Sequence, residues 1–457
     1  MKRSEILELR EFLRNELKEY NEEPINLCVK IDKQILESII FDTGNNGSKT
    51  FGLDSDMLSK IDFINISFDN FKLSIDRNDK KYDFSKLTNV KINPQTIYQK
   101  DMSNGILNGI EFTGNFDNIN IQGANFAGSK GAVINPQSVL GKNMTKCIFS
   151  DVIFEGPFDG ANIIGANFKN SVGAEINPHF IYLQSLNECV LEDAFIYTKG
   201  LGFKGINVMQ ANFTNTLNKI KMNPQKVYMK SLWKTVLSGV EFTGPFDDVY
   251  VGGTDFTGSK GAEIHPITVN GKSLAGTNLS SVTIIGSFEE VNVKNTDFKG
   301  SKGAKINPQE VYEKSLHGTK LYDVEITGDF DDVELVCTDF TGSKGAVITP
   351  MLVREQNFYK TNFCDVTFDG AFLSSCIDGA SFEGSKDARI YASSLRRRGI
   401  SNTNLKDAYI LGPLDGINLT NVQLEGSTII NLEKKEPEGN DEITKIKKLI
   451  FSSVHKL

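Results

Sequence analysis

The sequence of 457 residues has little of what catalysis and metal binding usually need: only four His, one Trp and six Cys without a CxxC pair. The histidines lie far apart and none accompanies a nucleophile at a suitable spacing; they are His179, His265, His317 and His455. A catalytic triad or a metal cluster is therefore not expected. We predict no enzymatic activity, no cofactor and no bound metal.

The cysteines follow no regular spacing; they are Cys28, Cys147, Cys189, Cys337, Cys364 and Cys376. Irregular, unpaired cysteines favour reduced, buried thiols in a cytoplasmic protein over disulfides. Long apolar runs are also missing, since no segment approaches the ~18 residues that would cross a bilayer. Met1 to Tyr20 alternates charged with apolar residues and lacks the apolar core of a signal peptide. We predict a soluble, cytoplasmic protein without membrane contact, and leave open secretion by a route that needs no classical signal.

An excess of positive charge is absent as well. Lys and Arg number 50 against 58 Asp and Glu, which gives a formal net charge of −8. A mildly acidic chain disfavours direct nucleic-acid binding.

Phe, by contrast, is abundant, with 31 residues. A polar-Phe dipeptide, mostly Asn-Phe or Asp-Phe, recurs along the chain with its second residue at Phe84, Phe126, Phe168, Phe213, Phe256, Phe298, Phe340, Phe382 and finally Leu424. The intervals are 42, 42, 45, 43, 42, 42, 42 and 42 residues. One small insertion between Thr198 and Asn218 explains the two longer intervals. A fixed period of this length predicts stacked units instead of one globular core.

Within one period the apolar positions are mostly five residues apart, which fits neither a helix period of about 3.6 nor a strand period of 2. The positions are Leu274, Leu279, Ile284, Phe288, Val293, Phe298, Ile306, Val311 and Leu316, with steps of 5, 5, 4, 5, 5, 8, 5 and 5. A chain that bends after each short strand would send one such side chain per side toward an axis. Eight steps then make two turns of a four-sided coil. The polar residue before each anchor is expected to point outward or to bond the backbone of the turn.

These motifs resemble the pentapeptide-repeat family, whose signature is a small residue, Asn or Asp, and then Leu or Phe. The matching segments are "GANF" (123–126 and 165–168), "GTDF" (253–256) and "GTNL" (276–279). The resemblance covers about Asn78 to Ile430 and implies an all-β, right-handed parallel β-helix. The sequence departs from the family pattern at the longer step, which carries "GSKGAxINPQ". Its Gly-Ser-Lys recurs too often, and in the wrong order, for a phosphate-binding loop.

We expect three regions: a helix and capping region at 1–77, a solenoid of about nine repeats at 78–432, and a linker with an amphipathic α-helix at 433–457. The last helix would use Ile443, Ile446, Leu449 and Ile450, either as a cap or to bind a partner or a second copy. The segment "INPQxVY" is expected to be coil or a helical turn, since Asn followed by Pro is a good helix start.

Charge also recurs with the period. An acidic row consists of Asp117, Asp159, Asp247, Glu289 and Asp331. A lysine row consists of Lys130, Lys260, Lys302, Lys344 and Lys386. On a four-sided coil the two rows would follow opposite corners. They either keep a long apolar-cored array soluble or form a surface for a protein partner.

Three functions follow. The first is a non-enzymatic scaffold that binds another protein or a second copy of itself. Binding to a second copy would form a homo-oligomer through the terminal helices. The second is a DNA mimic that binds a type II topoisomerase such as gyrase, because some pentapeptide-repeat proteins resemble DNA in shape and charge. The third is the recognition part of a secreted bacterial effector, since similar β-helices precede catalytic domains in some bacterial ubiquitin ligases. Only the short segment 433–457 follows the solenoid, and it contains no Cys, which disfavours this third function.

Overall fold

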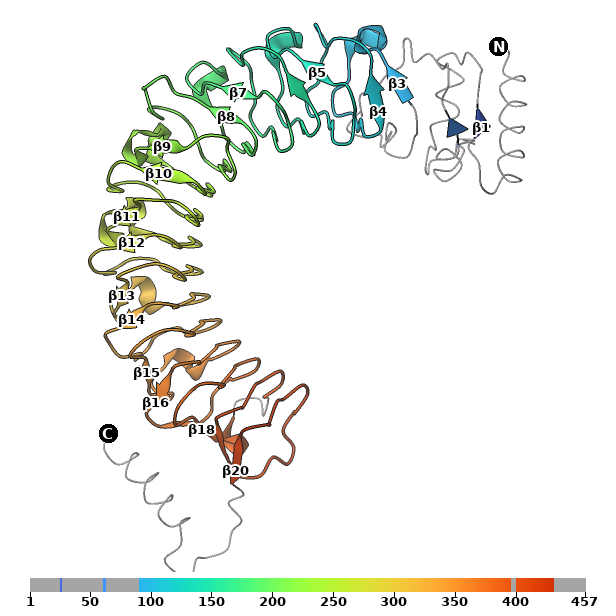
Figure 1. Ribbon diagram of the computed structural model, residues 1–457. Helices are drawn as coiled ribbons and strands as arrows, with labels where there is room; N and C mark the ends of the chain where they lie inside the picture. The colour runs from blue at the N-terminus through green and yellow to red at the C-terminus, as the bar shows by residue number, and fades with distance from the viewer. Residues whose placement is uncertain (1–24, 27–60, 63–89, 396–399, 431–457) are drawn as a thin grey trace, which may run out of the picture. The chain divides into compact units, whose positions relative to one another are not determined.

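Short parallel strands that stack on one another build the protein. The computed structural model describes residues 25–26, 61–62, 90–395 and 400–430. Its contacts divide the chain into unit 1 (Met1–Lys221 and Lys226–Met229) and unit 2 (Met222–Gln225 and Lys230–Leu457). Within each unit the labelled strands from β3 onward follow one another along the coil (Figure 1).

The strands are two or three residues long. Unit 1 contains β1 (Ile25–Asn26), β2 (Ile61–Asp62), β3 (Val90–Ile92), β4 (Ile110–Phe112), β5 (Val133–Ile134), β6 (Ile153–Phe154), β7 (Glu175–Ile176) and β8 (Phe195–Ile196), and β9 (Ile220–Met222) lies at its boundary. Unit 2 contains β10 (Val240–Phe242), β11 (Glu263–Ile264), β12 (Thr283–Ile284), β13 (Lys305–Ile306), β14 (Glu325–Ile326), β15 (Val347–Ile348), β16 (Thr367–Phe368), β17 (Ala371–Phe372), β18 (Arg389–Tyr391), β19 (Tyr409–Leu411) and β20 (Thr428–Ile430). The pairs are parallel, for example β5 with β6 and β13 with β14. β17 to β20 form one four-stranded sheet.

The turns of the coil alternate in length. Asn125 pairs with Ile106 on the preceding turn and with Ile148 on the next, and the second partner is farther along the chain than the first. In unit 2 Asp297 likewise has a nearer partner before it and a more distant one after it. One short turn and one long turn together make one period of the sequence. The chain is therefore an all-β parallel solenoid with two turns in each repeat, as the step pattern predicts.

The recurring apolar residues fill the interior. The anchor Phe side chains from Phe126 to Phe382 are fully buried, including Phe168, Phe256 and Phe298. Their rings meet neighbouring rings mostly edge to face, as between Phe288 and Phe298, whose centroids are 5.6 Å apart. Such pairs add specific attraction to the burial of apolar surface. The core is thus a continuous ladder within each unit.

The Asn or Asp before each anchor from Phe126 to Phe340 bonds the backbone of the turn, which confirms one of the two expected roles there. The Asn125 side chain accepts a hydrogen bond from the Ala127 N–H at 3.0 Å, and Asp297 accepts one from Lys299 at 3.0 Å. Asn and Asp favour this local bond because their short side chains reach the N–H two residues on. Each corner is closed by its own sequence.

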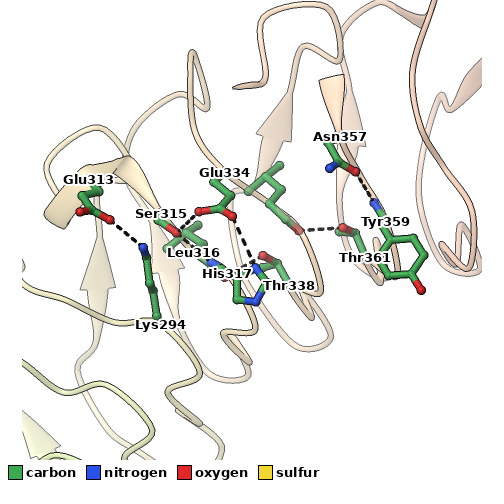
Figure 2. Close-up of polar contacts among 11 residues, drawn as sticks. Lys294, Glu313, Ser315, Leu316, His317, Glu334, Thr338, Asn357, Tyr359 and Thr361 are labelled. Atoms are coloured by element: carbon green, nitrogen blue, oxygen red, sulfur yellow. Dashed lines mark hydrogen bonds and ion pairs between the residues drawn. The ribbon is translucent and has the colours of Figure 1, made fainter. Parts of the chain in front are cut away.

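A buried row of hydroxyl donors distinguishes unit 2. Thr277, Thr296, Thr319, Thr338 and Thr361 have no exposed surface, and each donates its Oγ1 hydrogen to a carbonyl of the preceding turn. Figure 2 shows two of them: Thr338 donates to Leu316 O at 2.8 Å, and Thr361 to a carbonyl of the turn before it. These bonds satisfy polar groups that would otherwise be buried without partners.

The "INPQ" segment is a short turn that ties neighbouring turns together. Pro94–Thr96, Pro224–Lys226 and Pro266–Thr268 form single 3-10 turns, and the Asn93 side chain caps the first of them. The helical-turn alternative is therefore correct for these repeats. Further 3-10 turns follow at Tyr98–Lys100, Leu140–Lys142, Tyr182–Gln184, Tyr228–Lys230, Asn270–Lys272, Tyr312–Lys314, Arg354–Gln356 and Ala392–Ser394.

The Gln of this segment reaches the next turn. Gln137 Nε2 donates to Asp159 O at 2.8 Å while its Oε1 accepts from Lys142 Nζ at 2.6 Å. Gln95 makes the same pair of bonds with Asp117 O and Lys100. The recurrent Asn, Gln and Lys thus serve as a clamp between turns.

The α-helices expected in 1–77 and 433–457 lie outside the described residues. Every helical segment inside the described ranges is a 3-10 turn of three residues.

Candidate interaction surface

The predicted acidic row is exposed. Each member follows a buried Phe and lies in the turn after it: Asp117 and Asp159 in unit 1, and Asp247, Glu289 and Asp331 in unit 2. Several of their backbone carbonyls accept the clamp hydrogen bonds, as Asp331 O does from Gln309 Nε2 at 2.5 Å. The carboxylates themselves face solvent.

Lysine side chains that the sequence did not single out lie beside the acidic row. Lys142 Nζ donates to Asp159 O at 3.1 Å, and Lys230 Nζ forms an ion pair of 3.0 Å with Asp248. The Asn270 side chain and Lys230 together lower the pKa of the Asp248 carboxyl. These lysines come from the same clamp segment in each repeat, so the acidic row is partly neutralised.

The predicted lysine row is also exposed and is interleaved with other side chains. Lys130 pairs in a parallel bridge with Glu111, and Lys344 pairs with Glu325. Lys260, Lys302 and Lys386 pair with Glu241, Thr283 and Thr367. Further along the same sheet face Lys91 forms an ion pair with Glu111, and Lys305 with Glu325. The row is therefore a mixed, solvated face in several repeats.

The predicted contact residues Ile443, Ile446, Leu449 and Ile450 lie outside the described residues.

Both charged rows are interrupted in one repeat of unit 1. Val172 stands where other repeats place the Lys of Gly-Ser-Lys, and Lys204 follows the buried Phe203 where other repeats place an acidic residue. This repeat also carries the insertion that lengthens the period. Phe203 keeps the core filled, because its ring packs edge to face with Phe213 at 5.8 Å. The insertion therefore changes the surface and not the core.

Large apolar side chains are exposed in and beside this repeat, and we name them together the apolar patch. It consists of ten side chains that are 40–74% exposed: Ile153, Val172, Phe180, Tyr182, Leu183, Phe195, Leu201, Leu217, Tyr228 and Met229. All ten belong to unit 1. Exposed apolar residues gathered in this way mark interaction sites more often than singly scattered ones do.

Part of the apolar patch lies on a sheet face. Ile153 pairs with Val172 across a parallel bridge. The backbone N–H of Phe195 donates to Ala174 O, and that of Leu217 donates to Ala194 O, so the outward side chains follow one another turn by turn. Glu175, which pairs with Phe195, also lies on this face and is exposed, as Lys and Glu are in other repeats.

The other part lies on the adjoining corner. Tyr182 and Leu183 belong to one turn, and Tyr228 and Met229 lie two turns further, because Gln184 O accepts from Asn207 and Ile206 O accepts from Tyr228. Lys199 joins the two parts: its ammonium lies 5.8 Å from the centre of the Phe180 ring and 6.0 Å from that of Tyr197.

Two residues of this corner adopt an unfavourable backbone conformation. Leu183 and Met229 have φ of 53° and 51°, and they are 70% and 74% exposed. Gly141 and Gly271 occupy the same place in other repeats, where an added Cβ would meet nothing within 4 Å. A left-handed conformation costs a non-Gly residue about 1 kcal/mol. The chain therefore places its two most exposed large apolar side chains, among the described residues, where Gly would be cheaper.

The corresponding corner of unit 2 is polar. Glu313 and Glu355 hold the positions of Leu183 and Met229. Lys294 Nζ contacts Glu313 at 2.7 Å, and this ion pair lies near the Ser315, His317 and Glu334 cluster (Figure 2). The Lys294 bond lowers the pKa of the Glu313 carboxyl.

That cluster does not have the geometry of a catalytic triad. Ser315 Oγ donates to Glu334 Oε2 at 2.6 Å, and His317 Nδ1 lies 3.5 Å from Glu334 Oε1. The carboxylate stands between the hydroxyl and the imidazole, whereas a nucleophilic serine needs the imidazole next to it. In the described part of the chain no three His, Cys, Asp or Glu come together as a metal site would require.

His179 contributes to structure in the inserted repeat. It replaces the clamp Gln, and its Nε2 lies 2.8 Å from Gly202 O in the insertion. The imidazole thus holds the inserted segment against the preceding turn.

Two buried thiols give a prediction about reactivity. Cys147 and Cys189 lie at the place of the buried threonines and donate to Ile121 O and Ile163 O at 2.9 and 3.0 Å. Burial raises the pKa of both thiols to about 12. Because the thiolate is the reactive form, both should alkylate at least ~100-fold more slowly than the half-buried Cys337 at pH 8. Mass spectrometry after timed iodoacetamide treatment measures this, with the urea-unfolded protein as control. Equal rates in the native protein would contradict the burial.

The fold defines a parallel β-solenoid protein. No family model and no curated protein matches the sequence. Among solved structures the chain is similar to HetL, a pentapeptide repeat protein involved in heterocyst differentiation regulation from the cyanobacterium Nostoc sp. strain PCC 7120. The identity is 13%, the match covers 71% of this chain and 91% of HetL, and the TM-score is 0.12.

The chain is also similar to QnrB1, a plasmid-mediated fluoroquinolone resistance protein, at 11% identity. This match covers 75% of the chain and 93% of QnrB1, with a TM-score of 0.11. HetL is a member of the family that the sequence motifs resemble. Values this low carry no function from either protein to this chain.

The described residues contain no helix with the length and apolarity needed to cross a bilayer.

Proposed function

We propose that the protein is a non-enzymatic scaffold that binds another protein through the apolar patch of unit 1. The carrying observation is that ten apolar side chains are exposed between residues 153 and 229, in and beside the repeat where both charged rows are interrupted. At roughly 80 Å² each, about half of the area that an aromatic side chain can bury, they sum to roughly 800 Å². Divided between the sheet face and the corner, this area is comparable for each part to the ~300–600 Å² of the largest patch on a typical monomer, which is often functional.

The exposure of Leu183 and Met229 supports the same function. Their left-handed backbone conformation recurs at Gln99, Glu313 and Glu355 in other repeats, so the fold sets the conformation, and only the apolar side chains are particular to this corner.

The charged rows support solubility more than recognition. Lysines beside the acidic row and acids within the lysine row leave neither row uniformly charged. A DNA mimic needs an extended negative surface, so no observation favours the gyrase-binding alternative over the scaffold. Nothing specific favours the effector alternative either.

We also propose the finer features expected from the sequence: four sides in each turn, a cytoplasmic location, and association with a second copy through the terminal segments. Bridged positions such as Asp101, Ile106 and Glu111 recur at steps of five along one turn, which is the spacing of successive sides.

Affinity capture with the full-length protein tests the proposed function. In an extract from its native cell, the wild type should retain at least one protein that the double variant Leu183→Gly and Met229→Gly loses at least tenfold. Gly is the residue used at this place in other repeats, so the variant should fold and lack two anchors. Quantitative mass spectrometry of the eluates gives the ratio.

The matched control is Glu313→Gly with Glu355→Gly, which changes the same corner positions in unit 2. It should retain the same proteins as the wild type. Light scattering on both double variants and the wild type reports whether the partner is a second copy. If the patch variant and the control retain the same proteins in equal amounts, and neither changes its mass, the scaffold proposal is wrong.

A further inference from the structure

The corner of the apolar patch carries positive charge at the position that is acidic in the five repeats of the acidic row. Lys204 follows Phe203 as Asp117 follows Phe116 and Asp247 follows Phe246. Lys199 and Lys226 lie nearby, and Gly205 N–H donates to Lys226 O at 2.7 Å. All three lysines are exposed. None forms an ion pair with a carboxylate in the described part of the chain.

Carboxylates also lie beside this surface. Loss of hydration, with Asp159 and Glu175 nearby, raises the pKa of the Tyr197 phenol, and Asp248 on the turn after Met229 is paired with Lys230. The three lysines named above stay available to a partner, on a chain whose formal net charge is −8. A partner with carboxylates among its apolar side chains would complement this surface.

The spacing of the corner residues matches one face of an α-helix. Leu183, Lys204 and Met229 lie on three successive turns. With ~4.8 Å between turns, Leu183 and Met229 are ~10 Å apart. Lys204 lies on the turn between them, two residues before Ile206, whose carbonyl accepts a hydrogen bond from the Tyr228 N–H. On a helix the residues i and i+7 are also ~10 Å apart, with i+3 and i+4 between them on the same face.

From this register we infer that the corner of the apolar patch binds an acidic amphipathic helix of a different protein, with apolar residues at i and i+7 and a carboxylate at i+3 or i+4. Leu183 and Met229 contact the apolar residues, and Lys204 pairs with the carboxylate. The inference rests on the proposed scaffold function and specifies its partner.

The charges and the side chains disfavour other occupants. A two-fold contact between the patches of two copies would place these lysines against one another. The 442–457 segment of this chain is itself rich in Lys, with Lys445, Lys447, Lys448 and Lys456. Aromatic side chains with lysines are also found where single-stranded nucleic acid binds, but the most exposed residues here are aliphatic: Leu183, Leu201, Leu217 and Met229.

A display selection with the full-length protein tests the inference. The library is a set of helical peptides, five turns long, with Leu at i and i+7 and all other exposed positions randomised. Selected peptides should be enriched in Asp or Glu at i+3 and i+4. Fluorescence anisotropy with the best synthetic peptide should give at least tenfold weaker binding to Lys204→Asp, and at least tenfold weaker binding to Leu183→Gly with Met229→Gly.

Lys204→Asp is suited to this test because Asp is the residue that other repeats carry at this place, so folding is not at risk. Lys302→Asp, on the lysine row of unit 2, is the matched control and should bind the peptide as the wild type does. Reversing the charge on both sides gives a second measurement. A peptide with Lys at i+3 and i+4 should bind Lys204→Asp more tightly than it binds the wild type.

Four results would overturn the inference. The selected peptides could show no acidic preference, or the best peptide could bind the wild type and Lys204→Asp equally well. Single-stranded oligo(dT) could compete with the peptide, or the wild type could be a dimer that the double variant Leu183→Gly and Met229→Gly dissociates. If affinity capture still shows a protein whose binding depends on the apolar patch, any of these results contradicts only the inference that the partner presents an acidic helix. If capture also fails, the scaffold function itself is wrong.

Discussion

Replacing Phe363 with alanine should lower the free energy of unfolding by about 3 to 5 kcal/mol, the usual range for a fully buried aromatic residue. Phe363 has no exposed surface, and its ring meets Phe358 at 5.6 Å, Phe368 at 5.0 Å and Phe382 at 5.1 Å. The truncated side chain would leave a cavity that the strands on either side cannot close, because hydrogen bonds fix their spacing. Urea denaturation, with hydrogen exchange of the amides in the flanking turns, measures the loss.

The neighbouring outward position provides the control for this substitution. Tyr359 lies on the same turn and is 39% exposed, so Tyr359→Ala should change the unfolding free energy by less than about 1 kcal/mol. Phe363→Leu should cost about 1 kcal/mol, because Leu279 and Leu321 occupy the same place in other repeats. A loss below about 1 kcal/mol for Phe363→Ala would show that the packed interior described above is wrong at this turn.

Replacing Gly303 with alanine should cost roughly 2 to 4 kcal/mol, as the sum of two effects. Gly303 has φ of +77°, and a Cβ there would lie 2.8 Å from the Ile284 carbonyl oxygen on the preceding turn. The left-handed conformation accounts for about 1 kcal/mol, and the backbone contact adds the remainder because the turns cannot separate without breaking their bonds. The same close approach recurs at Gly131, Gly173, Gly261 and Gly345, with distances of 2.7 to 3.1 Å.

Gly271→Ala separates these two contributions. Gly271 has φ of +65° but no atom within 4 Å of an added Cβ, so its substitution should cost only about 1 kcal/mol. Thermal and urea unfolding of both variants provide the comparison. Equal losses at Gly303 and Gly271 would mean that backbone conformation alone, and not the distance between turns, explains the second Gly of the "GSKGA" motif.

The sequence predicted the fold well because each turn repeats the same local chemistry. The five-residue steps predicted parallel turns in pairs, and Asn125 and Asp297 show why: each closes its own corner with a side-chain bond. The eight steps of one period make two four-sided turns, so the sequence also predicted that the turns repeat in pairs. The hydrogen bonds of Gln137 to the next turn were not predictable, because they depend on which segments the coil places side by side.

The surface was harder to predict. The residues of both charged rows are exposed, but their partners were missed, since Lys230 and Asp248 come together only across turns. The apolar patch was missed because an exposed Leu183 and a buried Leu186 look alike in a list of apolar residues. Val172 in place of Lys, within the repeat that also carries the insertion, was the available signal.

The alternation of short and long turns limits how such a chain can change in length. Removing one turn alone would bring two short or two long turns together and would break the clamp at that junction, such as the one between Gln137 and Asp159. Only gains or losses of a whole period keep each clamp opposite its acceptor. Genes for arrays of this kind should therefore lengthen and shorten by duplicating or deleting whole pairs of turns.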